Sequence, residues 1–124
     1  MNAVGGEEAV YIAFVLTLYA DLPDTPTRPS PMDQSLARKL HQEAIPLALV
    51  ESACLLATLR RLARAPDLPL LPKIRSLAYF LPVIAELQQQ PLPAGYLDYL
   101  RLKVRTLSSD SRLGVQKSTL LDER

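Results

Sequence analysis

Basic side chains gather in the middle of the sequence, on both sides of a proline-rich stretch. Three arginines end an apolar run, and a lysine, an arginine and a tyrosine follow it: Arg60, Arg61, Arg64, Lys73, Arg75 and Tyr79. Arginine and lysine bind phosphate groups, and an aromatic ring offers a surface on which the bases of a single strand can stack. These residues therefore predict a nucleic-acid-binding face, which Arg101, Lys103 and Arg105 could extend.

A structural role competes with this prediction. Cations at the C-terminal end of a helix interact favourably with its dipole, and their alkyl chains cover apolar surface. This role explains Arg60, Arg61 and Arg64 well. It does not explain Lys73 and Arg75, because we place these two at the start of the next helix, where positive charge is unfavourable. The surplus of cations there favours an anionic partner.

Charge is distributed unevenly along the chain, although the formal net charge is only +1. Residues 1–57 hold three Lys/Arg and seven Asp/Glu, whereas residues 58–124 hold eleven and six. The asymmetry indicates either an anionic partner for the second half or attraction between the two halves within one fold. The sequence leaves both interpretations open.

Groups that could perform catalysis or hold a metal are scarce. The chain has one Cys and one His, too few for a zinc site of the sulfur and imidazole type. Adjacent Glu7 and Glu8 point to different helix faces, and no phosphate-loop, dinucleotide-binding, metalloprotease or nucleophile-elbow motif occurs. We interpret His41 as a surface residue and Cys54 as a buried, inert thiol. We therefore expect no enzyme, no metal and no cofactor.

Composition favours one all-helical domain. The 124 residues are enough for a single core, 48% of them are hydrophobic, and the eleven prolines fall mostly between the apolar runs. The runs themselves have helical spacing. We predict a single compact orthogonal bundle in residues 1–107 and a flexible tail in residues 108–124. The five predicted helices lie near residues 7–20, 31–43, 46–64, 73–90 and 94–107.

The run 46–64 should form the centre of the bundle, because its first two-thirds is apolar on almost every side. We expect six of its residues to be nearly inaccessible to solvent: Leu49, Val50, Ala53, Cys54, Leu56 and Ala57.

Two local signals concern helix starts. Ser30 and Asp33, with Pro31 between them, predict a capping box at the start of the helix 31–43. Pro82 lies inside the predicted helix 73–90. We expect a kink there; the alternative is a helix that begins near Pro82.

The stretch 40–53 matches part of the helix-turn-helix pattern. Ala44 fits the turn, where glycine is customary, and Val50 and Ala53 fall where the second helix packs on the first. Any pair of crossed helices can produce a similar pattern.

Residues 10–87 resemble the C-terminal helical module of DnaD-like bacterial replication-initiation proteins. The resemblance lies in an aromatic-bearing first helix, the helix pair that carries Val50 and Ala53, and the stretch from Tyr79 to Ile84. In that family a Tyr-Ile-x-x-Ile-Leu type motif is associated with DNA binding, so the resemblance implies DNA as the partner. This chain lacks the tryptophan common after that motif, and Pro82 is an addition. The stretch SLAYFLPVIAEL, residues 76–87, is similar to that of small uncharacterised proteins of bacterial mobile elements, which implies a replication or plasmid-maintenance setting.

A protein adaptor is the alternative function. Leu68, Leu70 and Leu71 in the proline-rich connector, with Leu120 and Leu121 in the tail, could leave apolar surface for a protein partner or for a homo-oligomer.

The apolar run 9–20 bears on the compartment. It has about a dozen residues, where a membrane span needs roughly twenty. It also lacks the basic residues of a signal peptide. We expect a cytoplasmic protein with no membrane partner.

Overall fold

The computed structural model describes the backbone of residues 2–123 and the side chains of residues 6–109. Within this part of the chain the protein is all-helical, as predicted, and contains no strand. Five α-helices and one 3-10 helix follow one another: α1 (Asn2–Asp21), α2 (Pro31–Gln42), α3 (Leu47–Leu62), η1 (Leu77–Phe80), α4 (Leu81–Gln89) and α5 (Tyr96–Glu123).

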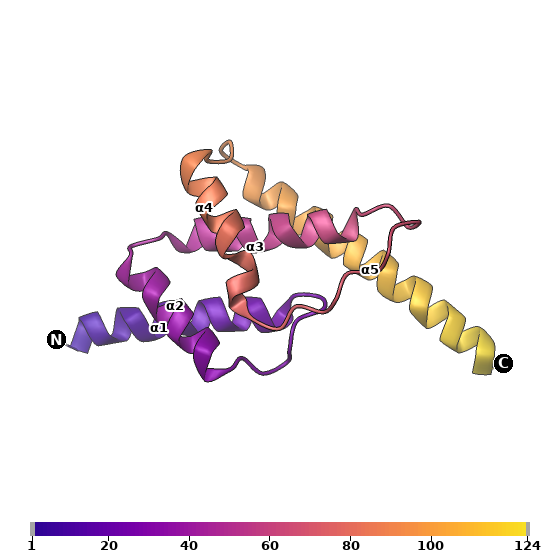
Figure 1. Cartoon of the computed structure of the whole chain (residues 1–124), viewed down its shortest axis with the longest axis horizontal. Helices are drawn as coiled ribbons and strands as arrows, with labels where there is room; N and C mark the ends of the chain where they lie inside the picture. Colours follow the sequence, from indigo (N-terminus) through magenta and orange to yellow (C-terminus); the bar gives the residue numbers. More distant parts are fainter. Residues whose placement is uncertain (1, 124) are drawn as a thin grey trace.

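Helix α3 is the central element of the fold. It contacts α1, α4, α5 and η1, and α2 reaches it through α1 and η1. Figure 1 shows α4 crossing α3 steeply. Val50, Ala53 and Cys54 on this helix have no solvent exposure. The predicted central helix is therefore confirmed.

Two of the six residues expected to be inaccessible on α3 are only partly buried, namely Leu49 and Leu56. They are seven residues apart and therefore lie on one stripe of the helix, which Arg60 continues at the surface. Leu55, on another face, is buried instead. The neighbouring helices cover α3 on most sides but leave this stripe partly open.

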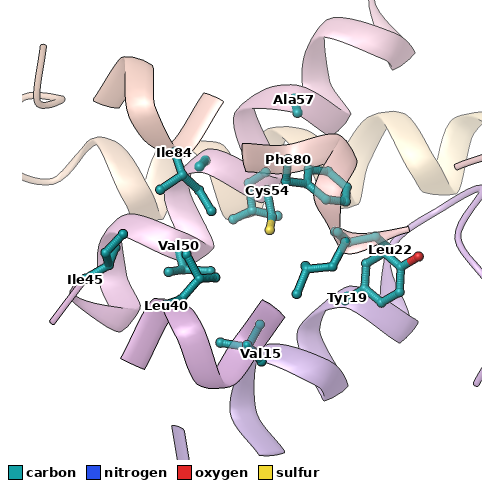
Figure 2. Packing of buried hydrophobic residues seen from close by; sticks show 14 of the residues in the cluster. Val15, Tyr19, Leu22, Leu40, Ile45, Val50, Cys54, Ala57, Phe80 and Ile84 are labelled. Carbon is teal, nitrogen blue, oxygen red and sulfur yellow. The ribbon is translucent and has the colours of Figure 1, made fainter. Parts of the chain in front are cut away.

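The core is built from side chains of the five described α-helices and of η1. Figure 2 shows Val15 of α1, Leu40 of α2, Val50 of α3 and Ile84 of α4 pointing into the same interior. Tyr19 of α1 meets Phe80 edge to face, with ring centroids 6.1 Å apart.

The capping box at the start of α2 is present as predicted. The Ser30 backbone N–H donates to Asp33 Oδ2 across 2.8 Å, and the Asp33 backbone N–H donates to Ser30 Oγ across 3.1 Å. Asp33 is fully buried. Its other oxygen, Oδ1, accepts a hydrogen bond of 2.9 Å from the Leu77 backbone N–H, so the same carboxylate also positions η1.

The turn between α2 and α3 ends α2 with a Schellman motif. The Ile45 N–H donates to the Leu40 carbonyl and the Ala44 N–H to the His41 carbonyl, which is the bonding pattern that defines the motif. Ala44 has a left-handed backbone with φ of 58°. The turn residue is thus where the helix-turn-helix pattern placed it.

The region predicted as the helix 73–90 is different in the structure. Residues 71–76 have no regular structure, η1 begins at Leu77, and α4 begins at Leu81. Pro82 lies in the first turn of α4, where its missing N–H needs no partner. The expected kink is therefore wrong, and the alternative, a helix that begins near Pro82, is correct.

Helix α5 continues beyond the predicted end at residue 107, and Figure 1 shows its distal half extending past the other helices. Side chains after residue 109, including Leu120 and Leu121, lie outside the described residues. The flexible tail therefore stays a prediction. None of the helices described is both long and apolar enough to cross a membrane.

Candidate nucleic-acid interface

Four of the predicted site residues line one depression at the C-terminal end of α3. Three are arginines that come from the end of this helix and the residues after it, and the fourth is the η1 tyrosine. The depression has a volume of about 330 Å³. Its lining comprises Arg60, Arg61, Arg64 and Tyr79 with the apolar residues Ala57, Leu71 and Val83. The lining thus combines three cations and one aromatic ring with apolar surface, and it includes no carboxylate.

Arg61 is the most constrained of these arginines, with only 10% of its side chain exposed. It donates to the Pro72 carbonyl across 2.9 Å, to Tyr79 Oη across 3.2 Å and to Asp24 Oδ2 across 3.4 Å. Burial lowers its pKa, but the bonds to Tyr79 and Asp24 outweigh this effect and raise the pKa overall. Arg61 therefore acts as a clamp: it links α3 to the loop at Asp24, to the connector at Pro72 and to η1 at Tyr79.

The clamp fixes the ring of Tyr79. The Arg61 guanidinium carbon lies 5.4 Å from the centroid of that ring, within the range of a cation–π contact. The ring also meets Phe80 edge to face at 5.2 Å. Tyr79 nevertheless remains 42% exposed, so its ring is both oriented and accessible.

Arg60 is paired with a carboxylate. Its two terminal nitrogens donate to the two oxygens of Glu86 on α4, across 2.9 and 2.6 Å. This hydrogen bonding raises the pKa of Arg60 and lowers the pKa of Glu86. Much of the Arg60 charge is therefore offset at the rim of the depression.

Three of the predicted cations, namely Arg64, Lys73 and Arg75, have no carboxylate partner among the described residues. Arg64 donates only to the Pro69 carbonyl, across 3.2 Å. Lys73 and Arg75 are exposed on the extended segment that leads from Pro72 to η1. Neither of the latter two starts a helix, so the argument from an unfavourable helix dipole is wrong. Their exposure still leaves them available to an anion.

The cations of α5 are not brought to this depression. Arg101 donates to both oxygens of Glu51, across 2.7 and 2.8 Å, and to Asp98 across 3.0 Å. The bonds to Glu51 and then to Asp98 raise its pKa. Arg105 lines a different depression, together with Asp21, and Lys103 is exposed on α5. The predicted extension therefore does not share the site at the end of α3.

The charge asymmetry has a partial explanation inside the fold. The ion pairs Arg61–Asp24 and Arg101–Glu51 each join a cation of the second half to a carboxylate of the first. Attraction between the halves therefore accounts for part of the pattern. Arg64, Lys73 and Arg75, which have no carboxylate partner among the described residues, stay available to an external anion.

Helix α3 cannot serve as the recognition helix of a helix-turn-helix protein. Such a helix inserts an exposed face into the major groove. Between Leu47 and Leu59 only Ala48 is exposed. The turn at Ala44 is present, but the surface of α3 that could reach a ligand begins at Arg60.

The proline-rich connector exposes apolar side chains beside the same depression. Leu70 is 98% exposed, and Leu68 and Leu71 are also exposed. Leu71 lines both this depression and a smaller one, which lies between the connector, the end of α3 and Asp24. The expectation of apolar surface in the connector is confirmed for these three leucines.

Two contacts that shape the site carry no sequence signal. Arg61 reaches Tyr79 because the connector returns to α3, and Leu77 reaches Asp33 because η1 lies against α2. A pattern within either segment alone reveals neither.

Side chains that could bind a metal ion do not cluster among the described residues. In the part of the chain that the structure describes, no three His, Cys, Asp or Glu residues lie close enough to share a metal ion.

Comparison with known proteins identifies no matching family model, curated protein or solved structure.

Proposed function

We propose that this protein is a non-enzymatic nucleic-acid-binding protein whose contact surface is the depression at the end of α3. The observation that carries the proposal is the lining of that depression, which has three arginines, Tyr79 and no carboxylate. Arg64 in that lining, and Lys73 and Arg75 on the exposed segment between the two lining residues Leu71 and Tyr79, supply the phosphate contacts.

DNA is the proposed nucleic acid, and the family resemblance supports this choice. Tyr79 opens the stretch that resembles the DNA-binding motif of DnaD-like proteins, and it is also the residue that lines the depression. An accessory role in replication or in mobile-element maintenance is the setting that the resemblance suggests.

The test is the salt dependence of binding to generic DNA, measured by fluorescence anisotropy. Binding weakens as salt rises, and each phosphate-contacting cation that is removed makes the log-log slope shallower by up to about one unit. Arg64→Ala, Lys73→Ala and Arg75→Ala each produce this change on unrelated sequences, because phosphate contacts carry no base information.

Lys39→Ala is the matched control. Lys39 is exposed on α2, which contributes no residue to the depression. Its removal leaves the slope unchanged. Absence of binding at low salt to both single-stranded and double-stranded DNA contradicts the proposal.

A protein adaptor is the second candidate, and the exposure of Leu70 favours it. An almost fully exposed leucine flanked by Leu68 and Leu71 is apolar surface that a second copy of the chain could cover. Sedimentation over a range of concentrations tests this: self-association that Leu70→Ser abolishes supports the adaptor. A monomer at every concentration removes this form of it.

A further inference from the structure

We infer that the depression at the end of α3 receives an unstacked base of a single-stranded nucleic acid, with its ring against Tyr79. The inference rests on the proposed function and specifies the ligand of the same site. Tyr79 supplies the stacking surface, the apolar residues of the lining contact the base, and cations contact the neighbouring phosphates.

The ring of Tyr79 is prepared for stacking before a ligand arrives. Arg61 holds its hydroxyl and lies over the ring, and Arg61 is itself fixed by the Pro72 carbonyl. Phe80, which is fully buried, supports the ring from the side. Because the ring is already ordered yet 42% exposed, binding loses little side-chain entropy there.

The size and lining suit one nucleotide unit. The volume of about 330 Å³ is at the small end of the range for small-molecule sites, which is about 300–1,000 Å³. Ala57, Leu71 and Val83 give the apolar contact that a base needs, and Arg64 is the lining arginine that has no carboxylate partner among the described residues and so is available to the phosphate. The site thus fits an anion that also carries a flat apolar ring.

A base inside a duplex cannot use this arrangement. Both of its faces are stacked on neighbouring base pairs, and only its edges are open in the grooves. Reading those edges usually requires an exposed helix or ribbon, and α3 has no such face before Arg60. A ring surface next to exposed cations is instead the combination that proteins use for single strands.

The segments that contribute to the depression also carry the cations proposed for the phosphates on either side of the bound base. Arg64 follows α3, and Lys73 and Arg75 lie on the segment that runs from Pro72 to η1. The segment is pinned to the rest of the fold by the Ile74 N–H, which donates to the Asp24 carbonyl across 2.9 Å. The cations are therefore presented by a fixed backbone.

The experiment compares two oligonucleotides of equal length, one of deoxythymidine and one that is abasic throughout. Both carry the same phosphates, so the difference in affinity isolates the bases. The intact strand should bind about 5- to 150-fold more tightly, the range that stacking of one base on an aromatic ring gives. Tyr79→Leu should abolish this difference, and Tyr79→Phe should retain it.

Tyr99→Leu is the matched control, because Tyr99 on α5 is 46% exposed and lies outside the depression. It should leave the difference intact. Equal affinity of the wild-type protein for the intact and abasic strands overturns the inference but leaves the proposed function standing. Tighter binding to a duplex than to the single strand also overturns it. No binding to either strand removes the proposed function and the inference together.

Discussion

Asp33 accepts a hydrogen bond from the backbone N–H of Leu77 across 2.9 Å, although 44 residues separate the two in the sequence. The same carboxylate closes the capping box with Ser30. One buried side chain therefore sets both the start of α2 and the start of η1. Since η1 carries Tyr79, this contact also determines where the aromatic wall of the candidate site lies.

Removal of the Asp33 carboxylate should destabilise the fold. Asp33→Ala leaves the Ser30 and Leu77 N–H groups without their acceptor. Loss of a contact that caps a helix costs about 0.5–2 kcal/mol, and a hydrogen bond to a charged group contributes about 1.5–3 kcal/mol. We therefore expect a loss of about 2–5 kcal/mol in the free energy of unfolding, measured with urea. Gln34→Ala, at the exposed neighbouring position, should change it little. An Asp33→Ala protein of wild-type stability contradicts the linking role.

Loss of the hydroxyl group should lower the stability of the protein at one of the two buried tyrosines of α1 but not at the other. Tyr11 donates to the Ile45 carbonyl across 2.7 Å, so Tyr11→Phe leaves a buried acceptor unpaired and should cost about 1–3 kcal/mol. The Tyr19 hydroxyl is buried and has no partner among the described residues. Tyr19→Phe should therefore be neutral or stabilising. Thermal unfolding of both variants checks this, and equal losses contradict it.

The sequence predicts those parts of the fold whose interacting residues are close together in the chain. The capping box of Ser30 and Asp33 is predictable because both partners lie within one helical turn. The break at Pro82 is ambiguous, because proline is compatible with either a kink or a first turn. The segment before η1 decides between these, and its extended course depends on the contact of Ile74 with Asp24, which no local pattern contains.

In the candidate site, too, the sequence does not reveal contacts between distant segments. The sequence identifies Arg60, Arg61 and Arg64 as one basic group, because they end one helix. It does not distinguish their roles: Arg61 is a clamp, Arg60 is paired with Glu86, and Arg64 meets only a carbonyl. These differences arise from the path of the connector and the crossing of α4 over α3. The residues most available to a ligand are consequently only part of the group that the pattern indicates.

The left-handed turn residue Ala44 offers a stabilising substitution. An L-residue in this conformation costs about 1–2 kcal/mol relative to the right-handed region, and glycine avoids that cost but increases the entropy of the unfolded chain. Ala44 is exposed and has φ of 58°, so no packing is lost. Ala44→Gly should raise the free energy of unfolding by about 0.5–1 kcal/mol.

Ala13→Gly is the control for Ala44→Gly. Ala13 is exposed in the middle of α1, where helical geometry disfavours glycine by roughly 0.5–1 kcal/mol. The two substitutions should therefore shift the urea midpoint in opposite directions. A decrease for Ala44→Gly contradicts the assignment of backbone strain to the turn.

Stability should fall in alkaline solution because of Cys54. Burial, and secondly the charge of Glu51, raise the pKa of this thiol from 9.0 to about 12. Between these two values the unfolded chain loses the thiol proton while the folded protein keeps it. The unfolded state then binds fewer protons, so the free energy of unfolding decreases as pH rises, by up to about 1.4 kcal/mol per pH unit for this group. Below pH 9 the contribution is fully present.

Urea unfolding at pH 7, 9 and 10.5 measures this decline, and Cys54→Ala supplies the comparison. The variant should be less stable at pH 7, because it leaves a small cavity, but it should lose less stability between pH 9 and 10.5 than the wild type does. Tyr11 and Tyr19, whose pKa values burial raises to about 12, add a similar decline above pH 10 in both proteins. Parallel declines from pH 9 to 10.5 mean that the Cys54 thiol ionises equally readily in the folded and unfolded states.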